Sequence, residues 1–393
     1  MKKINPSERV TIALTLLILA PLGGAAAEQN TDVCKAADGA LSKGQLEEAL
    51  SLYQTCRQQN APRLETLSNL GIVYTRLGQF ENGVKTYQQA LALDPGNPQV
   101  NMNLGLAYLK SERYENAVPA FARALVGQPD NLQAAELLAV CHYQLKQYEL
   151  AAVEAERVRK SKPDEPSVAF LLGSAYLKMK LYDKAISLIN FALQKASTAE
   201  AHAILGEAFL GARAYRKALD ELLKAAEMQP QIPSLHSNMA EAYAGLGNTD
   251  QAIAAFQKEL EKTPRDFKSN YFLGRLMRLK GDFEASKRYL AAAEQLRPGN
   301  AAVLYEYAVF ALQAKDFSKA EALVRQVLEK YPDYTGAHIL LSQVYFRTRR
   351  REEAERERSI AETLRTQEQA RPSGHERTAL TSEDSLPPDL ERP

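Results

Sequence analysis

Small and large apolar positions recur along most of this chain at one fixed interval. The residues that return 34 positions later are Gly71 as Gly105, Tyr74 as Tyr108, Tyr87 as Phe121, Ala90 as Ala124 and Pro95 as Pro129. A period of this length indicates a solenoid, in which each unit buries its apolar face only against its neighbours. The spacing within each period suits two short helices and contains no strand pattern. The sequence therefore predicts an all-α fold.

One small-residue position runs through the whole repeat region. It holds Ala49, Gly83, Ala117, Ala151, Ala185, Ala218, Ala252, Ser286, Ala320 and Ala354. Every step equals the fixed interval except the step from Ala185 to Ala218, which is one position shorter. The missing residue falls between Ala192 and Gly206, in a connection, where a solenoid tolerates a deletion. The chain should therefore contain about ten helical hairpins.

Close helix crossing explains the small residues, because two helix axes approach only where neither carries a bulky side chain. Large residues should fill the space around each crossing. On first helices these are Tyr74, Tyr108, Tyr176, Phe209, Tyr243 and Tyr345, and on second helices Tyr53, Tyr87, Phe121, Ile189, Leu222 and Phe256. Burying one such side chain contributes roughly 1.5–3 kcal/mol, so ten hairpins can build an elongated core.

The residues that begin and end helices agree with a division of each repeat into two helices. The residues placed to cap first helices are Asn97, Asn131, Asp266 and Asn300. Proline is expected at the first helical position at Pro98, Pro166 and Pro233, where its missing N–H costs nothing. The turns inside hairpins are expected at Gly78, Gly247 and Gly281.

The pattern of a large residue, Leu-Gly, Tyr, Ala, Phe, Ala and Pro at these offsets resembles the tetratricopeptide repeat family. The stretches LSNLGIVYTRLGQFENGVKTYQQALALDP and MNLGLAYLKSERYENAVPAFARALVGQP carry the resemblance most clearly. It implies a right-handed superhelical solenoid of about ten helix-turn-helix repeats over residues 28–366. It also implies a protein or peptide partner, whose identity the resemblance does not give.

Residues 1–27 lie outside the repeat pattern. Lys2, Lys3 and Arg9 accompany the uncharged run VTIALTLLILAPL, which is followed by Gly-Gly-Ala-Ala-Ala. This order is typical of a secretory signal peptide, and the best cleavage point follows Ala27. We expect an exported, periplasmic or extracellular protein with no membrane insertion after cleavage. The alternative is an uncleaved anchor in the inner membrane, although the run is shorter than the roughly 17–25 residues of a spanning helix.

The last repeat departs from the pattern. Arg358 stands where the third repeat has Phe121, in the charged run RRREEAERERSIAETLRTQEQ. A terminal unit has no neighbour on its outer side, so this run predicts a solvated capping helix. The alternative, a basic patch of Arg347, Arg349, Arg350 and Arg351 for nucleic acid or anionic lipid, is opposed by the acids that follow. Residues 367–393 are poor in apolar side chains and predict a disordered tail.

Charge and motifs narrow the function. Without residues 1–27 the chain has 46 basic and 47 acidic side chains, so no overall field attracts nucleic acid. The sequence contains no GxSxG, no phosphate-binding glycine loop, no HExxH and no CxxC. We therefore expect no enzymatic activity and no metal or cofactor.

Three histidines share one repeat position. His202, His236 and His338 stand where the second repeat has Leu67. They are interpreted as packing residues between repeats. A metal or pH-sensing role is the alternative, and it lacks a third ligand.

The three cysteines leave a pairing open. Cys34 and Cys56 lie at similar heights on the two helices of the first repeat, so a disulfide is possible there. Two unconnected small core residues are the alternative. Cys141 is expected to be buried as a small apolar residue.

The family resemblance places a partner-binding groove at positions 2, 5, 9, 12 and 13 of each repeat. In the middle third this selects Met102, Leu106, Leu109, Val140, Tyr143, Phe170 and Leu177. Further along it selects a basic and aromatic group beside Glu207 and Glu241, namely Lys268, Tyr271, Arg275, Arg278 and Tyr305. The alternative is that several apolar members serve the packing between repeats.

Three functions fit these observations to different degrees. The first is a non-enzymatic scaffold of the cell envelope that holds an amphipathic segment in the groove, as a monomer or in a hetero-complex. The second is an assembly factor or structural subunit of a pilus, secretion or outer-membrane complex. The third, an enzyme whose repeats deliver substrate, has too little chain outside the repeats for a catalytic domain.

Overall fold

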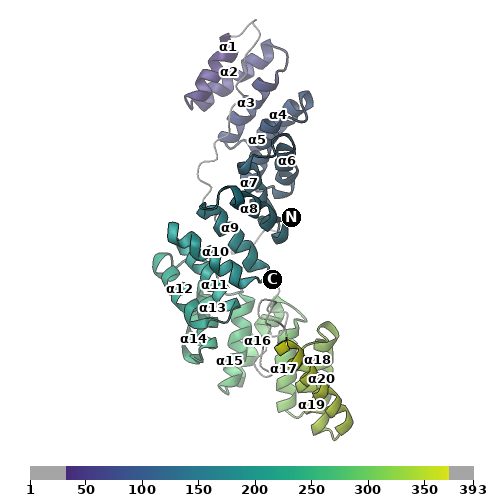
Figure 1. Ribbon diagram of the computed structural model, residues 1–393. Coiled ribbons are helices and arrows are strands. Elements are labelled where there is room, and N and C mark those ends of the chain that lie inside the picture. Colours follow the sequence, from purple (N-terminus) through teal and green to yellow (C-terminus); the bar gives the residue numbers. More distant parts are fainter. Residues whose placement is uncertain (1–31, 371–393) are drawn as a thin grey trace. The chain divides into compact units, whose positions relative to one another are not determined.

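A computed structural model of the protein describes residues 32–370, and these residues form twenty α-helices with no strand (Figure 1). The expected signal peptide at residues 1–27 lies outside the described residues, as does most of the expected tail. The first helices of the ten hairpins are α1 (Asp32–Ser42), α3 (Leu64–Arg76), α5 (Pro98–Lys110), α7 (Leu132–Gln144), α9 (Pro166–Lys178), α11 (Ala199–Gly211), α13 (Leu235–Gly245), α15 (Phe267–Leu279), α17 (Ala301–Gln313) and α19 (Thr335–Arg347). The second helices are α2 (Leu46–Gln59), α4 (Phe80–Leu93), α6 (Tyr114–Gly127), α8 (Tyr148–Ser161), α10 (Tyr182–Lys195), α12 (Tyr215–Met228), α14 (Thr249–Lys262), α16 (Phe283–Leu296), α18 (Phe317–Lys330) and α20 (Arg351–Ala370).

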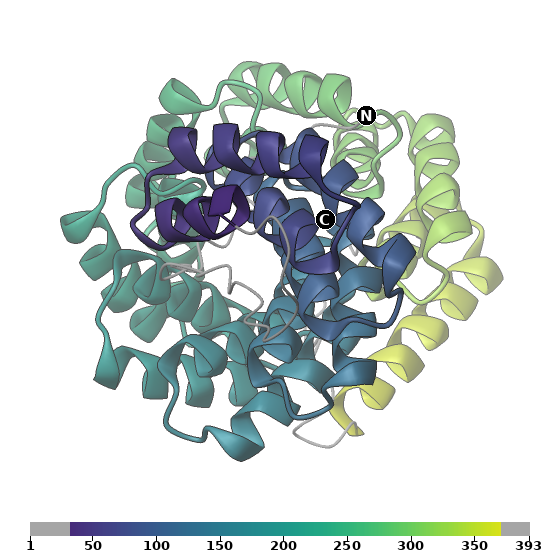
Figure 2. The same ribbon diagram turned by 90° about the horizontal axis from the view of Figure 1, so that it is seen from above.

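The chain forms two compact units. The first unit extends to Met179 and includes residues 184–201, and the second comprises residues 180–183 and the chain from His202 onward. Their boundary falls in the repeat that is one position shorter than the others. Within each unit a second helix packs against its own first helix and against the next one, so the hairpins follow one another in sequence order (Figure 2).

The helix crossings confirm the predicted pairing of small and large residues. A Cβ atom added to Gly71 would lie 2.5 Å from the ring of Tyr87, and one added to Gly105 would lie 2.6 Å from the ring of Phe121. Both rings are completely buried. Because even a methyl group does not fit there, glycine allows these first helices to meet the aromatic residue of the second helix.

The predicted caps are confirmed at four first helices. The side chains of these caps accept backbone N–H hydrogen bonds, from Val100 to Asn97 (3.1 Å), Ala134 to Asn131 (3.0 Å), Ser269 to Asp266 (2.7 Å) and Ala302 to Asn300 (3.0 Å). Pro98 and Pro166 occupy the first helical position as expected.

The prediction for Pro233 was wrong. Helix α13 begins at Leu235, after Ser234, which has a left-handed backbone with φ of 60° and makes no side-chain cap. The carboxylate of Glu259 on α14 instead accepts hydrogen bonds from the backbone of His236 and Ser237. Glu259 is 4% exposed as a residue, and burial raises the pKa of its carboxyl group.

The turns inside the hairpins share one left-handed residue. Glycine occupies it at Gly44, Gly78, Gly247 and Gly281, with φ between 74° and 83°. Other residue types occupy it at Glu112, Lys146, Lys180, Arg213, Lys315 and Arg349, with φ between 57° and 64°. The turn geometry therefore persists where the sequence offers no glycine.

The last hairpin confirms the predicted capping helix. Arg358 is exposed and forms an ion pair with Glu362 (3.1 Å), while only Ala354 and Ala361 are buried among residues 351–367. Helix α20 continues to Ala370, beyond the expected end of the repeats at position 366. No described helix has both the length and the apolar content needed to cross a bilayer.

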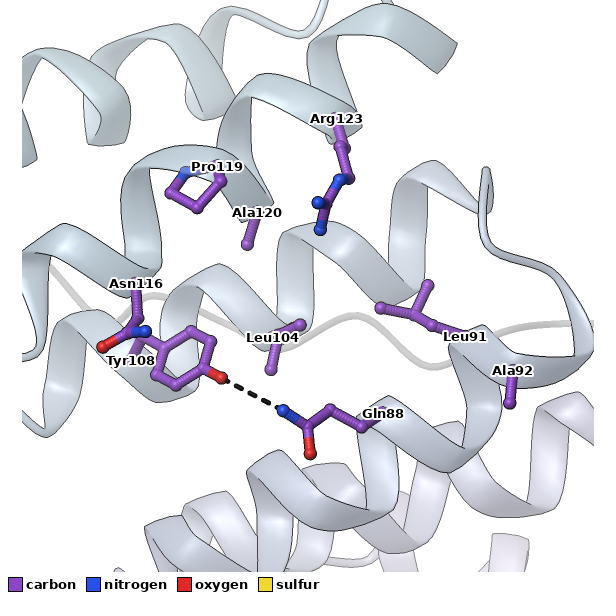
Figure 3. A pocket seen from close by; sticks show the side chains of 9 residues that line it. All are labelled: Gln88, Leu91, Ala92, Leu104, Tyr108, Asn116, Pro119, Ala120 and Arg123. Carbon is purple, nitrogen blue, oxygen red and sulfur yellow. Dashed lines mark hydrogen bonds between the residues drawn. The ribbon is translucent and has the colours of Figure 1, made fainter.

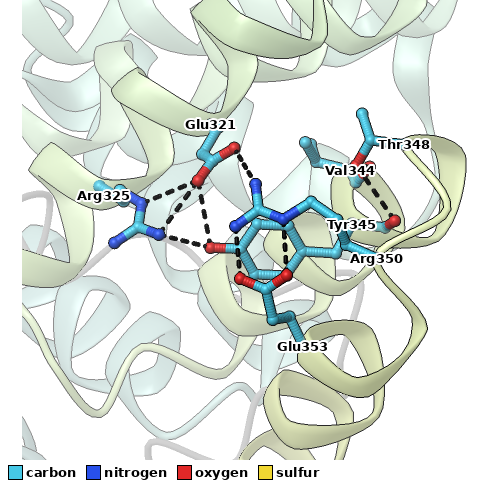
Figure 4. Close-up of polar contacts among 7 residues, drawn as sticks. All are labelled: Glu321, Arg325, Val344, Tyr345, Thr348, Arg350 and Glu353. Atoms are coloured by element: carbon cyan, nitrogen blue, oxygen red, sulfur yellow. Dashed lines mark hydrogen bonds and ion pairs between the residues drawn. The ribbon is translucent and has the colours of Figure 1, made fainter.

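Polar contacts join this last helix to α18 and α19 (Figure 4). The guanidinium of Arg350 lies 4.2 Å from the ring centre of Tyr345, and its Nη1 lies 2.8 Å from Oε2 of Glu321. Its Nε donates to Glu353 (2.6 Å). Arg350 therefore serves helix packing, which weakens the alternative of a basic patch at this end.

Candidate partner-binding face

The charges on the first helices are mixed in the first unit, whereas in the second unit they are acidic on α11 and α13 and mainly basic from α15 onward. In the first unit, α1, α3, α5, α7 and α9 carry four acids (Asp32, Asp38, Glu65 and Glu136) and four bases (Lys35, Arg76, Lys110 and Lys178). In the second unit, α15, α17 and α19 carry four bases (Lys268, Arg275, Arg278 and Arg347) and one acid (Glu306). We call the five charged residues of α15, α17 and α19 the basic sector.

The apolar part of the predicted groove is buried. Met102 is 4% exposed, Leu106 1% and Tyr143 5%, and Leu109, Val140 and Leu177 are buried as well. Helix α5 has nine buried residues because it packs against α3, α4 and α6. The prediction that Met102, Leu106 and Tyr143 line an open surface was therefore wrong. Phe170 alone of this group is partly exposed.

The two arginines of the predicted groove, Arg275 and Arg278, face an acid of their own chain. Nε of Arg278 donates to Oε2 of Glu306 (2.7 Å), and Nε of Arg275 lies 3.8 Å from its Oε1. The Glu306 side chain is 2% exposed, whereas those of Arg275 and Arg278 are 17% and 13% exposed. The carboxylate therefore lies inside and fixes the arginines, which remain nearer to the surface.

The predicted aromatic residues fall into two classes. Tyr271 is completely buried, so its prediction as a contact residue was wrong. Tyr305 is half-buried and packs edge-to-face on Tyr334 with ring centres 5.4 Å apart. The hydroxyl of Tyr271 has no hydrogen-bond partner among the described residues, and burial raises its pKa well above the ordinary value.

An ion pair joins the basic sector to the preceding first helix. Nζ of Lys268 pairs with the carboxylate of Glu241 on α13 and also donates to Oδ1 of Asn238 (3.2 Å). Glu207 on α11 and Glu241 are the charged residues that the second unit carries on these two first helices. The face therefore changes sign from α13 to α15.

The histidines contact protein groups rather than one another. Nδ1 of His202 lies 2.6 Å from Glu221, and Nδ1 of His338 lies 2.6 Å from Glu357. His236 lies 3.1 Å from Nζ of Lys262, and burial with this cation lowers its pKa. Within residues 32–370, no group of three His, Cys, Asp or Glu side chains is arranged to hold a metal ion.

The first repeat contains a disulfide. Sγ of Cys34 and Sγ of Cys56 are 2.00 Å apart, and the two Cα atoms are 5.2 Å apart. The bond connects α1 to α2 in the terminal hairpin, which has a neighbour on one side within the described chain. Cys141 is completely buried, and burial raises the pKa of its thiol to about 12, so this thiol is inert.

A pocket of about 450 Å³ lies between the second helices α4 and α6, over α5 (Figure 3). Its polar side chains are Gln88, Tyr108, Asn116 and Arg123, and Leu91 and Pro119 contribute apolar surface. Nε2 of Gln88 donates to the hydroxyl of Tyr108 (3.4 Å).

The sequence pattern did not predict this pocket or the hydrogen bond between Gln88 and Tyr108 that crosses it. A hydrogen bond between a tyrosine hydroxyl and the residue 20 positions earlier recurs in three other repeats. Gln54 donates to Tyr74 and Arg325 donates to Tyr345, whereas the hydroxyl of Tyr176 donates to Glu156. A polar residue recurring 20 positions before the repeated tyrosine is the signal that could have found it.

Comparisons with known proteins agree with the helices and their spacing. Tetratricopeptide repeat models match residues 102–166, 170–233 and 237–301, residues 71–112 and residues 278–333 and 311–357. Together these segments cover more than half of the chain. The chain therefore belongs to the tetratricopeptide repeat family, whose members are helical scaffolds that bind protein or peptide partners.

Solved structures with similar folds include three further proteins. A tetratricopeptide repeat protein from Parabacteroides merdae is 15% identical, with a TM-score of 0.46 over 58% of this chain and 91% of that one. YrrB, described as having an unusual peptide-binding site, is 22% identical (TM-score 0.42, 46% and 93% covered), and MamA AMB-1 is 25% identical (0.39, 42% and 98%). These TM-scores are below 0.5, so the assignment rests on the family models and the helices. No curated protein is significantly similar in sequence.

Proposed function

We propose that this chain is a non-enzymatic scaffold of the cell envelope that binds an amphipathic protein segment on the first-helix face of its second unit. The observation that carries the proposal is the basic sector, where four cations share the first helices α15, α17 and α19 with one buried acid. Such a concentration of one sign selects a partner of the opposite sign.

Apolar side chains on the same helices define the rest of the partner. Tyr305 and Val309 on α17 and Ile339 on α19 are half-buried, and by the repeat they occupy groove positions 5 and 9. A bound segment would place its apolar side chains against these three residues and its acids toward Arg275, Arg278 and Arg347. Recognition by one apolar and one charged stripe is the usual mode for an amphipathic segment.

Crosslinking in the native cell tests this function. A photo-crosslinking residue at Tyr305 should capture a partner, and the same residue at Leu223, which is 38% exposed on the second helix α12, should not. Adding Lys268→Glu and Arg347→Glu should reduce capture most at low salt, because exposed charges are screened at high salt. Equal capture from Tyr305 and Leu223 would rule out the assigned face.

The envelope location rests on two features. Residues 1–27 have the order of a secretory signal peptide, and disulfides such as Cys34–Cys56 persist mainly in oxidising compartments. Mature protein should begin at Glu28 and show one reactive thiol, Cys141, after denaturation. An intact Met1 in the membrane fraction would support the uncleaved anchor, and three reactive thiols would reject the disulfide in the cell.

An assembly factor or structural subunit is the second candidate function. The observation that favours it is exposed apolar surface on second helices of the first unit, where Val126 is 83% exposed and Leu93 53% exposed on the two helices that form the pocket. In that case Val126→Lys should release the protein from a large complex in cell extracts, as seen by size-exclusion chromatography. The variants of the basic sector should leave such a complex intact.

A further inference from the structure

The chain that follows α20 contains a segment with the chemistry that fits the basic sector. Residues 381–391 include the four acids Glu383, Asp384, Asp389 and Glu391 and no lysine or arginine. Leu386 and Leu390 lie between and beside these acids. The segment therefore combines negative charge with apolar side chains, which is the combination that the proposed partner requires.

The face that would receive this segment is positive on its outer side. Glu306 is the acid of the basic sector and is 2% exposed, so its charge lies beneath the two arginines. Arg347, at the end of α19, is exposed. The half-buried Tyr305, Val309 and Ile339 lie on the same first helices and offer apolar contacts.

We propose that residues 381–391 bind to the basic sector of their own second unit, as an internal ligand that a partner must displace. The acids Glu383 and Asp384 meet Arg275, Arg278 and Arg347, and Leu386 and Leu390 meet Tyr305, Val309 and Ile339. The proposal uses the face assigned under the proposed function and adds its occupant in the absence of a partner.

The length of chain permits this contact. Helix α20 ends at Ala370 and packs against α19, the helix that carries Arg347 of the basic sector. Twelve residues separate Ala370 from Glu383, and a stretch of that length spans up to about 40 Å when extended. A tether this short gives an effective concentration in the millimolar range, so weak contacts suffice for occupancy and the internal segment is favoured over a second copy.

Nuclear magnetic resonance on the isotopically labelled full chain tests the proposal directly. At low salt the backbone resonances of residues 381–391 should be broadened by attachment to the folded unit. Glu383→Lys should make them narrow and intense. Glu376→Lys is the matched control, because it makes the same change of charge seven residues earlier in the same chain. Both positions follow α20 in the sequence, so neither substitution changes a residue of the repeats.

A second variant changes the basic sector instead of residues 381–391. Lys268→Glu with Arg347→Glu should also release residues 381–391, and raising the salt concentration should do so in the unaltered chain. Narrow resonances in the unaltered chain at low salt would overturn the proposal. So would equal effects of Glu383→Lys and Glu376→Lys, or broadening that disappears on dilution, which would indicate binding to a second copy.

The same variants separate this proposal from the proposed function. Displacement of an internal ligand predicts that Glu383→Lys strengthens capture of the partner at Tyr305 by roughly threefold or more, since the competent face is then fully available. Unchanged capture would reject the internal ligand and leave the scaffold function intact. If the resonances of residues 381–391 are broadened but the chain captures no partner, the scaffold function alone is rejected.

Discussion

The two units share one repeat and one set of helix crossings, yet their first helices present different chemistry. The first unit balances four acids with four bases and buries nine of the thirteen residues of α5. The second unit instead separates its charges, with Glu207 and Glu241 on α11 and α13 and four bases with one acid on α15, α17 and α19. Helix α17 buries six of its thirteen residues, and α15 and α19 bury eight each. The periodic residues that hold the hairpins together therefore leave the remaining first-helix positions free to differ.

A single buried position illustrates this freedom. Glu306 occupies the repeat position that holds Phe272 in the preceding repeat and Leu340 in the following one, so an acid stands where both neighbours have apolar side chains. It is tolerated because Arg278 donates to it at 2.7 Å and Arg275 lies 3.8 Å away. A buried acid with such partners positions cations on the face at the expense of apolar packing.

The largest difference in stability loss between the two units is expected for substitutions at two residues that share repeat position 9. Leu106 is 1% exposed on α5, whereas Val309 on α17 is half-buried. Leu106→Glu should lower the free energy of unfolding by roughly 4–5 kcal/mol, because the carboxylate has neither water nor a partner. Val309→Glu should cost about 1 kcal/mol, since its side chain can reach solvent.

Urea denaturation followed by circular dichroism measures both variants. Leu106→Met is the control, because this volume-conserving change should cost less than about 1.5 kcal/mol. Similar losses for Leu106→Glu and Val309→Glu would show that the first helices are equally open in the two units. The contrast between the two faces would then not hold.

An intermediate effect is expected at the ion pair of the basic sector. Arg278→Met removes the closer partner of a carboxylate that is 2% exposed and should cost about 2–3 kcal/mol. Adding Glu306→Leu, the residue type of the next repeat at Leu340, should recover most of that loss because the apolar pair no longer contains an unpaired charge.

A double-mutant cycle by equilibrium unfolding gives the interaction energy of this pair. Additive losses from Arg278→Met and Glu306→Leu would mean that Arg278 and Glu306 act independently. The control pair is Arg358 and Glu362 on α20, whose side chains are 76% and 64% exposed and should show almost no coupling.

The sequence was sufficient to predict the parts of the fold that repeat. Gly71 with Tyr87 and the cap Asn97 each follow from spacing and residue type, because the same local physics applies in every repeat. Burial of Leu106 was not predictable in this way, since spacing gives the position on the helix and not the side chains that cover it. The pairing of Arg278 with Glu306 joins two different repeats and occurs once, so no periodic signal marks it.

The smallest effect should be equal in the two units, because it concerns the turn they share. Lys146 in the first unit and Lys315 in the second are both exposed and have φ of 60° and 61°. A left-handed backbone brings Cβ close to the following carbonyl oxygen, and glycine avoids this contact. Lys146→Gly and Lys315→Gly should each be more stable than the corresponding alanine variant by about 1 kcal/mol.

Alanine is the reference because it removes the lysine contacts equally in both comparisons. The measurement is equilibrium urea unfolding of the four variants, and a gain at one turn without the other would show that the units do not share this backbone geometry.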